Sequence, residues 1–313
     1  MKTIKLTYPH ELSREQLPET VAAIGFFDGI HRGHQTVIKQ AVTEAKHHNM
    51  ESAVITFYPH PSVVLKNNHQ VKYITPLREK QEILEEMEVD RLYLITFDKE
   101  LSALSPQDFI DHFIIGLHIK HVVAGFDFSY GHKGKGNMEV IGEHSRGEFS
   151  HSIVEKVSLH NEKISSTKIR NLLEIGDVEQ ANVLLGRQLT TSGIVIEGDK
   201  RGRKIGYPTA NINYDEDALL PKPGIYAVRV TIGDTTYDGL GSLGINPTFT
   251  ADRKDLSLEV NILDYHNHLY GEELILEWYK FVRDEEKFDN VEKLIEKIKE
   301  DESIIREYFS NLV

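Results

Sequence analysis

The chain has 313 residues, enough for about two domains that each bury a core. Its 36 Lys and Arg against 49 Asp and Glu leave a formal charge of −13, which disfavours a general nucleic-acid binder but not an anionic small-molecule ligand. There is no Cys, so disulfides, thiolate metal sites and thiol nucleophiles are excluded. No apolar run approaches the roughly 18 residues that cross a bilayer, and the first residues do not resemble a secretory signal. We therefore expect a cytoplasmic protein with no nucleic-acid or membrane partner.

The first half alternates between strand-like and helix-like patterns. An apolar run at Val21–Phe27 precedes a helical stretch at Gln35–Met50 and a β-rich run at Ala53–Phe57. The helical stretch has its apolar residues on one face at a period of 3.6: Val37, Ile38, Ala41, Val42 and Ala45. The order predicts a βαβ unit in which this helix packs on a parallel sheet.

Further helices of this half are predicted from their caps. Thr75 before Pro76 and Ser105 before Pro106 resemble N-caps followed by Pro at the first helical position. Strands are expected after these helices, at Arg91–Phe97 and His121–Phe126. A short helix is expected from Asp177, with Gly186 as its C-cap. We place the domain boundary there, giving domains 1–186 and 187–313.

Beyond Leu189 the pattern changes to short alternating strands. These are expected at Gly193–Glu197, Tyr226–Ile232, Leu256–Leu263 and Leu274–Val282. Gly233 and Asp234 are typical of a tight hairpin turn. The second half is therefore expected to be a small antiparallel barrel or sandwich, closed by an amphipathic helix from Val291 to about Phe309.

The string GFFDGIHRGH places His31 and His34 just after a predicted strand, where a helix begins. Gly25, Gly29 and Gly33 permit a tight turn and a close approach of the backbone to a ligand. The free N–H groups of the helix start suit a phosphate, and the imidazoles suit the charge that develops when an α-phosphate is attacked. The alternative is a glycine-rich turn with two solvated histidines. A second pair of the same spacing, at residues 118 and 121, has no glycine and is interpreted as structural.

A second glycine-rich stretch, GDKRGRKIGYPTANI, follows a strand of the second half. It is not a Walker A loop, but its glycines and cations suit a polyphosphate. The alternative is a basic hairpin loop. Downstream, Thr209 and Asn211 offer the hard oxygen ligands that Mg²⁺ prefers. The residues that suit phosphate are Gly198, Gly202 and Gly206 with Lys200, Arg201, Arg203 and Lys204.

The first half resembles the HxGH nucleotidyltransferase superfamily, and the whole GFFDGIHRGH string is similar to its FAD synthetase branch. Three further strings agree in order: TFYPHP at 56–61, GFDFSYG at 125–131 and ISSTKIR at 164–170. The resemblance implies a Rossmann-like α/β domain with His31 and His34 as catalytic residues. Tyr58 departs from the acidic residue that is common at its position in the family. Nucleotide contacts are implied for Gly25, Phe27, Asp28, Gly29, Gly33, Ser165, Ser166, Thr167 and Arg170, and flavin contacts for His60, Asp127, Phe128 and Tyr130.

Several of these residues also make chemical sense without the resemblance. Hydroxyls, free N–H groups and a guanidinium converge at Ser165–Arg170, although an ordinary N-cap with an exposed Arg is the alternative. Asp127 follows a strand at the edge where α/β sheets bind ligands, or it caps a turn. His60 lies between two prolines, which a purely structural corner explains equally well.

The pattern GxxxGRxxGxPTAN resembles the riboflavin kinase module, a barrel. The resemblance implies ATP contacts at Gly198, Arg201, Gly202, Arg203 and Gly206, Mg·ATP held by Thr209 and Asn211, and Glu259 as the base. On the strand LSLEVNILDY, Leu258, Val260 and Ile262 should face one way and Glu259 and Asn261 the other. Two residues depart from the family: Ser242 stands where Asn is common, and Asn261 where His is common.

Together the two resemblances imply flavin cofactor synthesis with ATP and Mg²⁺: riboflavin to FMN in the second half and FMN to FAD in the first. An adenylyltransferase with a degenerate, flavin-binding kinase module is one alternative. A non-catalytic flavin- or RNA-binding regulator is the other. The oligomeric state is left open.

Overall fold

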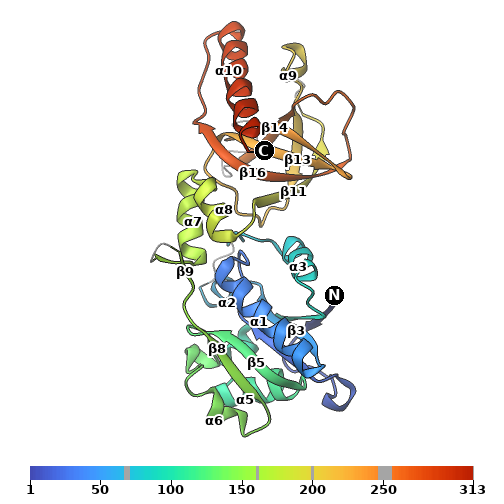
Figure 1. The fold of residues 1–313 in the computed structure, drawn as a ribbon, viewed down its shortest axis with the longest axis vertical. Coiled ribbons are helices and arrows are strands. Elements are labelled where there is room, and N and C mark those ends of the chain that lie inside the picture. The colour runs from blue at the N-terminus through green and yellow to red at the C-terminus, as the bar shows by residue number, and fades with distance from the viewer. Residues whose placement is uncertain (67–70, 160–161, 199–200, 246–255, 313) are drawn as a thin grey trace. The chain divides into compact units, whose positions relative to one another are not determined.

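The computed structural model describes residues 1–66, 71–159, 162–198, 201–245 and 256–312. The chain divides into two compact units, Met1–Ser166 and Thr167–Val313, which we call the first and second units. The first unit contains a parallel sheet with helices on both faces, and the second contains a closed barrel (Figure 1). The expected fold class, a Rossmann-like α/β domain before a small antiparallel barrel, is confirmed.

The main sheet of the first unit has the order β1-β4-β3-β2-β5-β8, and every neighbouring pair is parallel. The central strand β2 is buried along its whole length, as expected for a parallel strand covered on both faces. The strands are β1 (Lys2–Leu6), β2 (Thr20–Ile24), β3 (Glu51–Tyr58), β4 (Arg91–Thr96), β5 (Ile119–Gly125) and β8 (Ser150–Val154).

Helices cover both faces of this sheet. On one face, α1 (Arg32–His48) buries the five apolar residues expected at its inner face, and α3 (Leu77–Glu86) adds Leu84 to the same core. On the other face, α5 (Pro106–Ile110) and the π-helical turn η2 (Asp111–Ile115) bury Phe109 and Phe113. The smaller elements are η1 (Arg14–Gln16), α2 (Pro61–Leu65), α4 (Lys99–Ala103), β6 (Ser129–Tyr130), η3 (His132–Gly134), β7 (Gly136–Asn137), α6 (Ile141–Ser145), β9 (Ser158–Leu159) and β10 (Glu162–Lys163).

The expected caps are confirmed at two helices and wrong at a third. The Ser105 hydroxyl accepts from the Asp108 N–H at 3.1 Å, and Asp177 caps α8 (Val178–Leu185), which ends at Gly186. Thr75 is not an N-cap, because α3 begins at Leu77 with Pro76 before it. Thr75 is 2% exposed and its N–H donates to Asp28 Oδ1 at 3.4 Å, so a side chain far along the sequence holds it in place.

The second unit begins with the helices α7 (Ser166–Ile175) and α8, and α8 packs on the barrel. The Asn182 side chain donates to the Trp278 carbonyl at 2.7 Å and accepts from the Leu189 N–H at 2.7 Å. This helix therefore packs with the barrel. The expected boundary at residue 186 would instead place it in the first domain. That boundary stays a prediction.

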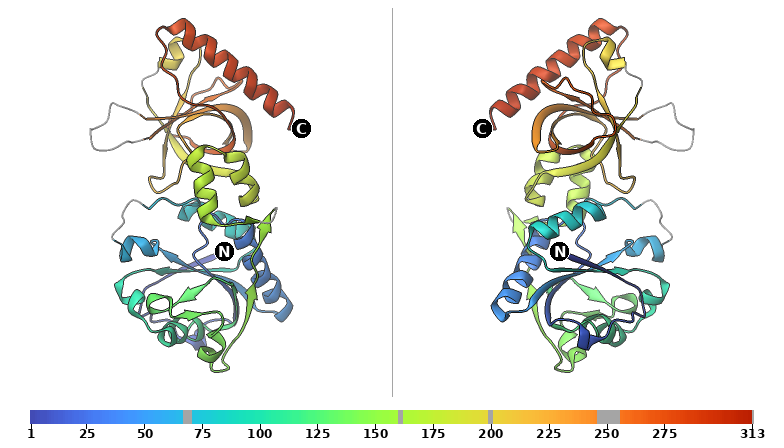
Figure 2. Two further views of the ribbon diagram at one scale, coloured as in Figure 1. Left: turned by 90° about the vertical axis from the view of Figure 1, so that its left-hand side faces the viewer. Right: turned by 90° about the vertical axis from the view of Figure 1, so that its right-hand side faces the viewer.

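Six antiparallel strands close the barrel in the order β11-β12-β15-β14-β13-β16, which leaves no free sheet edge (Figure 2). The turn expected at Gly233 and Asp234 joins β13 to β14. The helix α10 (Val291–Ser310) lies on the outer face, where Ile305 and Phe309 pack against Ile225 and other apolar side chains. The strands are β11 (Leu189–Ile196), β12 (Ala210–Tyr214), β13 (Gly224–Ile232), β14 (Thr235–Ile245), β15 (Leu256–Ile262) and β16 (Glu273–Arg283), and α9 is Arg201–Lys204.

Candidate functional site

Two stacked histidines lie in the turn between β2 and α1. His31 is the N-cap of α1, and its Nδ1 accepts a hydrogen bond from the His34 N–H at 3.2 Å. The two rings are 3.6 Å apart between centroids and 17° from parallel. A Cβ at Gly33 would lie 3.2 Å from His31 Cε1, so glycine at this position lets the imidazole fold back over the helix start.

Burial keeps both imidazoles neutral. Loss of hydration lowers the pKa of His31 to about 4, and it holds the pKa of His34 well below its usual range. Because Nδ1 of His31 accepts from a backbone N–H, the proton of the neutral ring is on Nε2. His31 therefore offers an N–H donor without a full charge, at a helix start that itself favours anions.

Other residues of the same turn pack against the histidines and set the shape of its backbone. Phe27 is 3% exposed, and its ring meets His34 edge-on with 5.4 Å between centroids. Phe27 has φ of 51° and Gly29 has φ of 89°, so the turn needs left-handed backbone at both positions. A Cβ at Gly25 would lie 3.0 Å from the Phe27 ring. In this structure Gly25 and Phe27 hold the turn in shape, and their expected nucleotide contacts stay predictions.

Asp28 joins this turn to two other segments. Its carboxylate is 4% exposed and accepts from the backbone N–H groups of Ile74 and Thr75. Its backbone carbonyl accepts from the Ser166 hydroxyl at 2.9 Å. The first and last motifs of the first half are therefore in direct contact, with Ser165 adjacent in the chain.

The remaining phosphate residues of that last motif, Thr167 and Arg170, fall in the second unit. Both lie on α7, one turn or less from Ser166. Their expected nucleotide contacts stay predictions.

The residues expected to bind flavin follow β3 and β5, the two strands that flank β2. His60 meets the Phe26 ring edge-on at 4.5 Å, and its Nδ1 accepts from the Ser62 N–H at 3.1 Å. Asp127 is exposed and pairs with Lys163 at 2.6 Å. These positions are at the carboxyl ends of parallel strands, where α/β sheets bind ligands.

The two aromatic residues of this set differ in their surroundings. Phe128 is partly buried and packs on the core. Tyr130 is 4% exposed, and its hydroxyl is 2.8 Å from His144 Nδ1. A Cβ at Gly136 would lie 2.4 Å from the Tyr130 ring, so protein covers this ring closely. Phe128 is therefore the better placed of the two for stacking on a ligand.

Lys80 and Thr56, neither of which was an expected site residue, contact the same turn. Lys80 of α3 donates to the Phe26 carbonyl at 3.0 Å, and the Thr56 hydroxyl donates to that carbonyl at 2.9 Å. Lys80 is four residues before Leu84, on the buried side of an amphipathic helix. A lysine on the apolar face of a helix is the sequence signal that could have identified it.

In the second unit, strand pairing places three polar residues in one row on the outside of the barrel. Asn211 of β12 pairs with Glu259 of β15, which pairs with Ser242 of β14. The neighbours Leu258 and Val260 are buried, which confirms the expected alternation along β15. Thr209 Oγ1 donates to Glu259 Oε2 at 2.9 Å. The two expected metal ligands and the expected base are thus neighbours.

Of the two family departures, Ser242 belongs to this row and Asn261 lies beside it on β15. Ser242 is directly opposite Glu259, and Asn261 shares the outward face of β15. Asn261 is 8% exposed and donates through Nδ2 to the Pro208 carbonyl at 2.7 Å. The amide of Asn261 therefore fixes the segment that carries Thr209.

The glycine-rich stretch folds against the same residues. A Cβ at Gly198 would lie 2.2 Å from Asn211 Nδ2, and one at Gly202 would lie 2.1 Å from the Tyr207 carbonyl oxygen. Gly206 has φ of 88°, a conformation that favours glycine. Arg203 is exposed. Lys200 lies outside the described residues, as do the side chains of Arg201 and Lys204.

The side-chain oxygens of Thr209, Asn211 and Glu259 fit a hard cation that is bound together with phosphate. Within the described part of the chain, no group of three or more His, Cys, Asp or Glu side chains could hold a metal by itself. Hydroxyl, amide and carboxylate oxygens are available at Thr209, Asn211 and Glu259. Mg²⁺ takes a few such oxygens and completes its shell with water and substrate phosphates.

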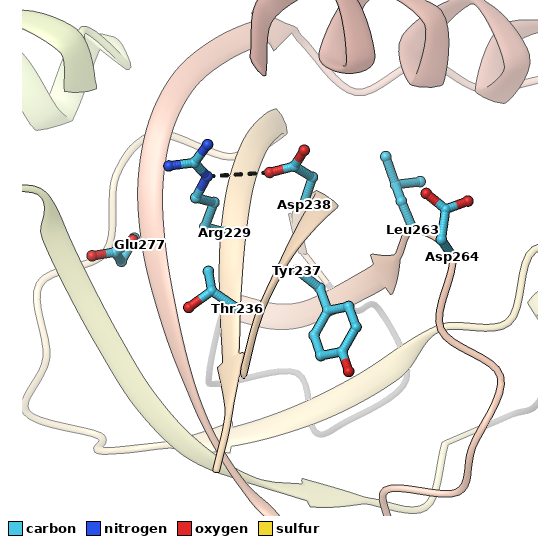
Figure 3. Close-up of a pocket in the computed structure, with 7 residues that line it drawn as sticks. All are labelled: Arg229, Thr236, Tyr237, Asp238, Leu263, Asp264 and Glu277. Atoms are coloured by element: carbon cyan, nitrogen blue, oxygen red, sulfur yellow. Dashed lines mark hydrogen bonds and ion pairs between the residues drawn. The ribbon is translucent and has the colours of Figure 1, made fainter. Parts of the chain in front are cut away.

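An open pocket of about 450 Å³ lies on the outside of the barrel (Figure 3). Three of its four charged lining residues form ion pairs within the protein, and the fourth, Glu277, accepts a hydrogen bond from the Tyr279 hydroxyl at 3.2 Å. Asp238 bonds Arg229 at 3.2 Å, and Asp264 bonds Arg306 twice at 2.8 Å. None of its lining residues is an expected site residue: Arg229, Thr236, Tyr237, Asp238, Leu263, Asp264 and Glu277.

Comparison with known proteins covers the whole chain. A sequence model of FAD synthetase matches residues 13–168, and one of riboflavin kinase matches residues 185–309. A bifunctional riboflavin kinase/FMN adenylyltransferase of Listeria monocytogenes is 49% identical over 313 residues, which cover 100% of this chain and 99% of the relative. The Bacillus subtilis protein of the same name is 44% identical over 314 residues, with the same coverage.

A solved structure also matches over the full length. It is described as a macrolide-efflux protein from Streptococcus pneumoniae, is 33% identical, and superposes with a TM-score of 0.88 over 98% of this chain and 99% of that one. Among the helices of the described residues, none has the length and apolar character needed to cross a membrane. The first half matches FAD synthetase, the second half matches riboflavin kinase, and bifunctional relatives match along the full length. The chain therefore belongs to the bifunctional riboflavin kinase/FMN adenylyltransferase family.

Proposed function

We propose that the chain converts riboflavin to FMN in the second unit and FMN to FAD in the first, with ATP as co-substrate in both. One observation supports this most directly. Each unit carries its own set of groups suited to a phosphate: the stacked His31 and His34 in one, and the row of Asn211, Glu259 and Ser242 in the other. The product of the second unit is the substrate of the first.

In the first unit, a phosphate oxygen of FMN attacks the α-phosphorus of ATP, and pyrophosphate leaves. The FMN phosphate is already ionised, so this step needs donors for the developing charge rather than a strong base. The Nε2–H of His31, the start of α1 and the hydroxyl of Ser165 supply such donors, whereas the Ser166 hydroxyl donates to the Asp28 carbonyl. His34 holds the His31 ring in place by stacking.

In the second unit, the ribityl 5′-hydroxyl attacks the γ-phosphorus of ATP, and ADP leaves. Glu259 accepts the hydroxyl proton as the new P–O bond forms. Thr209 orients the Glu259 carboxylate through their 2.9 Å hydrogen bond. Asn261 fixes the neighbouring backbone at Pro208.

We further propose that Thr209 and Asn211 hold Mg²⁺ together with ATP. When bound, the ion would neutralise phosphate charge and align the triphosphate for in-line transfer. The close fit of Asn211 against Gly198 fixes its amide beside the glycine-rich stretch.

The test is to incubate the protein with riboflavin, ATP and Mg²⁺ and to separate the flavins by chromatography. We expect FMN and then FAD. FAD from supplied FMN, with no product from riboflavin, would identify a degenerate kinase module. Flavin binding without either product would identify a regulator.

Two variants assign the reactions to their units. Glu259→Gln should lower the rate of FMN formation at least about a hundredfold and leave the rate of FAD formation from FMN unchanged. His31→Ala should do the reverse. A variant that removed both activities would contradict the assignment of one reaction to each unit.

A further inference from the structure

Lys80 is a buried amine next to the two-histidine turn. It is 4% exposed and lies on α3, and its Nζ donates to the Phe26 carbonyl at 3.0 Å. The amine also lies 5.0 Å from the centroid of the Phe26 ring. Its hydrogen-bond partner is a backbone oxygen rather than a carboxylate.

Such a placement is costly for the fold. An ammonium group removed from water loses much of its hydration free energy, which a single carbonyl and an aromatic face offset only in part. The burial lowers the pKa of Lys80 to about 8, with Asp28 opposing the shift. A methionine would fill the same space without this cost, so stability alone does not account for a lysine here.

Lys80 is connected to the candidate site through both the backbone and the ring of Phe26. The Phe26 carbonyl directly precedes Phe27 and Asp28, whose backbone leads to His31. The Phe26 ring contacts His60 at 4.5 Å. The charge also reaches His34, since Lys80 contributes to the lowered pKa of that imidazole.

We propose that Lys80 is a positioning residue of the first site, which fixes the turn through the Phe26 carbonyl and places a buried positive charge behind the two histidines. Within the protein Asp28 supplies part of the negative charge that favours the charged amine, and the phosphate groups of the substrates would add to it. This inference rests on the proposed FAD formation in the first unit. In this role Lys80 orients the turn and supplies positive charge near the histidines, and it does not contact the reacting atoms.

The experiment compares Lys80→Met, Lys80→Gln and a control, Lys99→Met, which removes an exposed lysine of α4. FAD formation from FMN gives kcat and KM, and FMN formation from riboflavin serves as an internal control in the same chain. Thermal unfolding of the whole chain is followed by circular dichroism. Trp278 is the only tryptophan and lies in the barrel, so its fluorescence separates the transition of the second unit.

We expect Lys80→Met to unfold at the same or a higher temperature than wild type, while its kcat for FAD falls at least about tenfold. Its KM for FMN should change less than about threefold, because Lys80 acts through the turn rather than on the flavin. Lys80→Gln, which keeps a donor but no charge, should recover only part of the rate. Lys99→Met should match wild type in every measurement.

Three results would overturn the inference. A wild-type rate in Lys80→Met removes any role in the reaction. A rate loss that a lower unfolding temperature explains makes Lys80 a residue of the fold. A full rate in Lys80→Gln removes the role of charge. If wild type itself makes no FAD from FMN, the proposed function fails first and the inference fails with it.

Discussion

Asp301 of α10 accepts three hydrogen-bond contacts from the guanidinium of Arg283, at 2.8 to 3.1 Å. The Asp301 side chain is 2% exposed and that of Arg283 is 15% exposed. Arg283 is the last residue of β16, so this buried ion pair joins the helix to the end of a barrel strand.

Breaking this pair should destabilise the barrel strongly. Asp301→Asn leaves a buried guanidinium without its counter-charge, and we expect a loss of about 3 to 5 kcal/mol in the free energy of unfolding. The double variant Asp301→Leu with Arg283→Met should lose much less. Denaturant unfolding followed by Trp278 fluorescence measures both. Glu302→Gln, which removes a partly exposed partner of Arg306, is the control and should cost less than about 1 kcal/mol. Equal losses in the single and double variants would contradict this account.

The two roles of His31 can be separated by substitution. His31→Asn keeps a side-chain acceptor for the N-cap, whereas His31→Ala loses it at a cost of about 1 kcal/mol. Both variants lack the Nε2–H donor, so both should form FAD about 10² to 10³ times more slowly. Flavin chromatography and thermal unfolding check the two effects. FMN formation should stay at the wild-type rate, and a nearly active His31→Asn would show that the cap is the main role.

Acid should destabilise the first unit before the second. The pKa of His31 is about 4 in the folded chain against 6.5 when free, so the unfolded state binds more protons between these values. The stability that the neutral His31 contributes is fully present above pH 6.5 and is lost as the pH falls toward 4, by about 3 kcal/mol. His34 adds a change of the same sign.

Denaturant unfolding at pH 7 and pH 5, with circular dichroism for the whole chain and Trp278 fluorescence for the barrel, tests this order. His31→Asn should flatten the pH dependence of the first unit. A pH dependence that is unchanged in His31→Asn would assign the effect to other groups.

Asn261 should matter for ATP in the kinase reaction. Its hydrogen bond to the Pro208 carbonyl fixes the segment before Thr209, so Asn261→Ala should raise the KM for ATP in FMN formation by about tenfold. FAD formation should not change. Asn213→Ala, an exposed amide of the neighbouring strand, is the matched control. An unchanged KM in Asn261→Ala would mean that the segment is held by its other contacts.

The sequence predicted most of what depends on local pattern. The inner face of α1 was predicted residue by residue, because apolar spacing at 3.6 residues reports directly on burial. The alternation around Glu259 was also predicted, because strand side chains must point to opposite faces. The caps at Ser105 and Asp177 follow from side chains that bond within one helical turn.

Long-range contacts were not predictable in this way. Thr75 looked like a cap, but the carboxylate of Asp28 holds its backbone. The structure buries this carboxylate against the backbone N–H groups of Ile74 and Thr75, a contact that no local pattern indicated, and the expected nucleotide contact of Asp28 stays a prediction. Lys80 was missed because no motif contains it, and its partner Phe26 is 54 residues away. Such contacts depend on how α3 packs on the sheet, which local propensity does not determine.

Closure of the barrel has a consequence for how the kinase half can work. Glu259 is on β15, which is hydrogen-bonded to a strand on each side, and the ring of strands has no open end. The backbone that carries the carboxylate is thus held in position, and β15 cannot separate from its neighbours to bring Glu259 closer to a hydroxyl. Any rearrangement that accompanies the entry of riboflavin or the departure of ADP therefore has to leave the hydrogen-bonded ring of strands, and the position of Glu259 within it, unchanged.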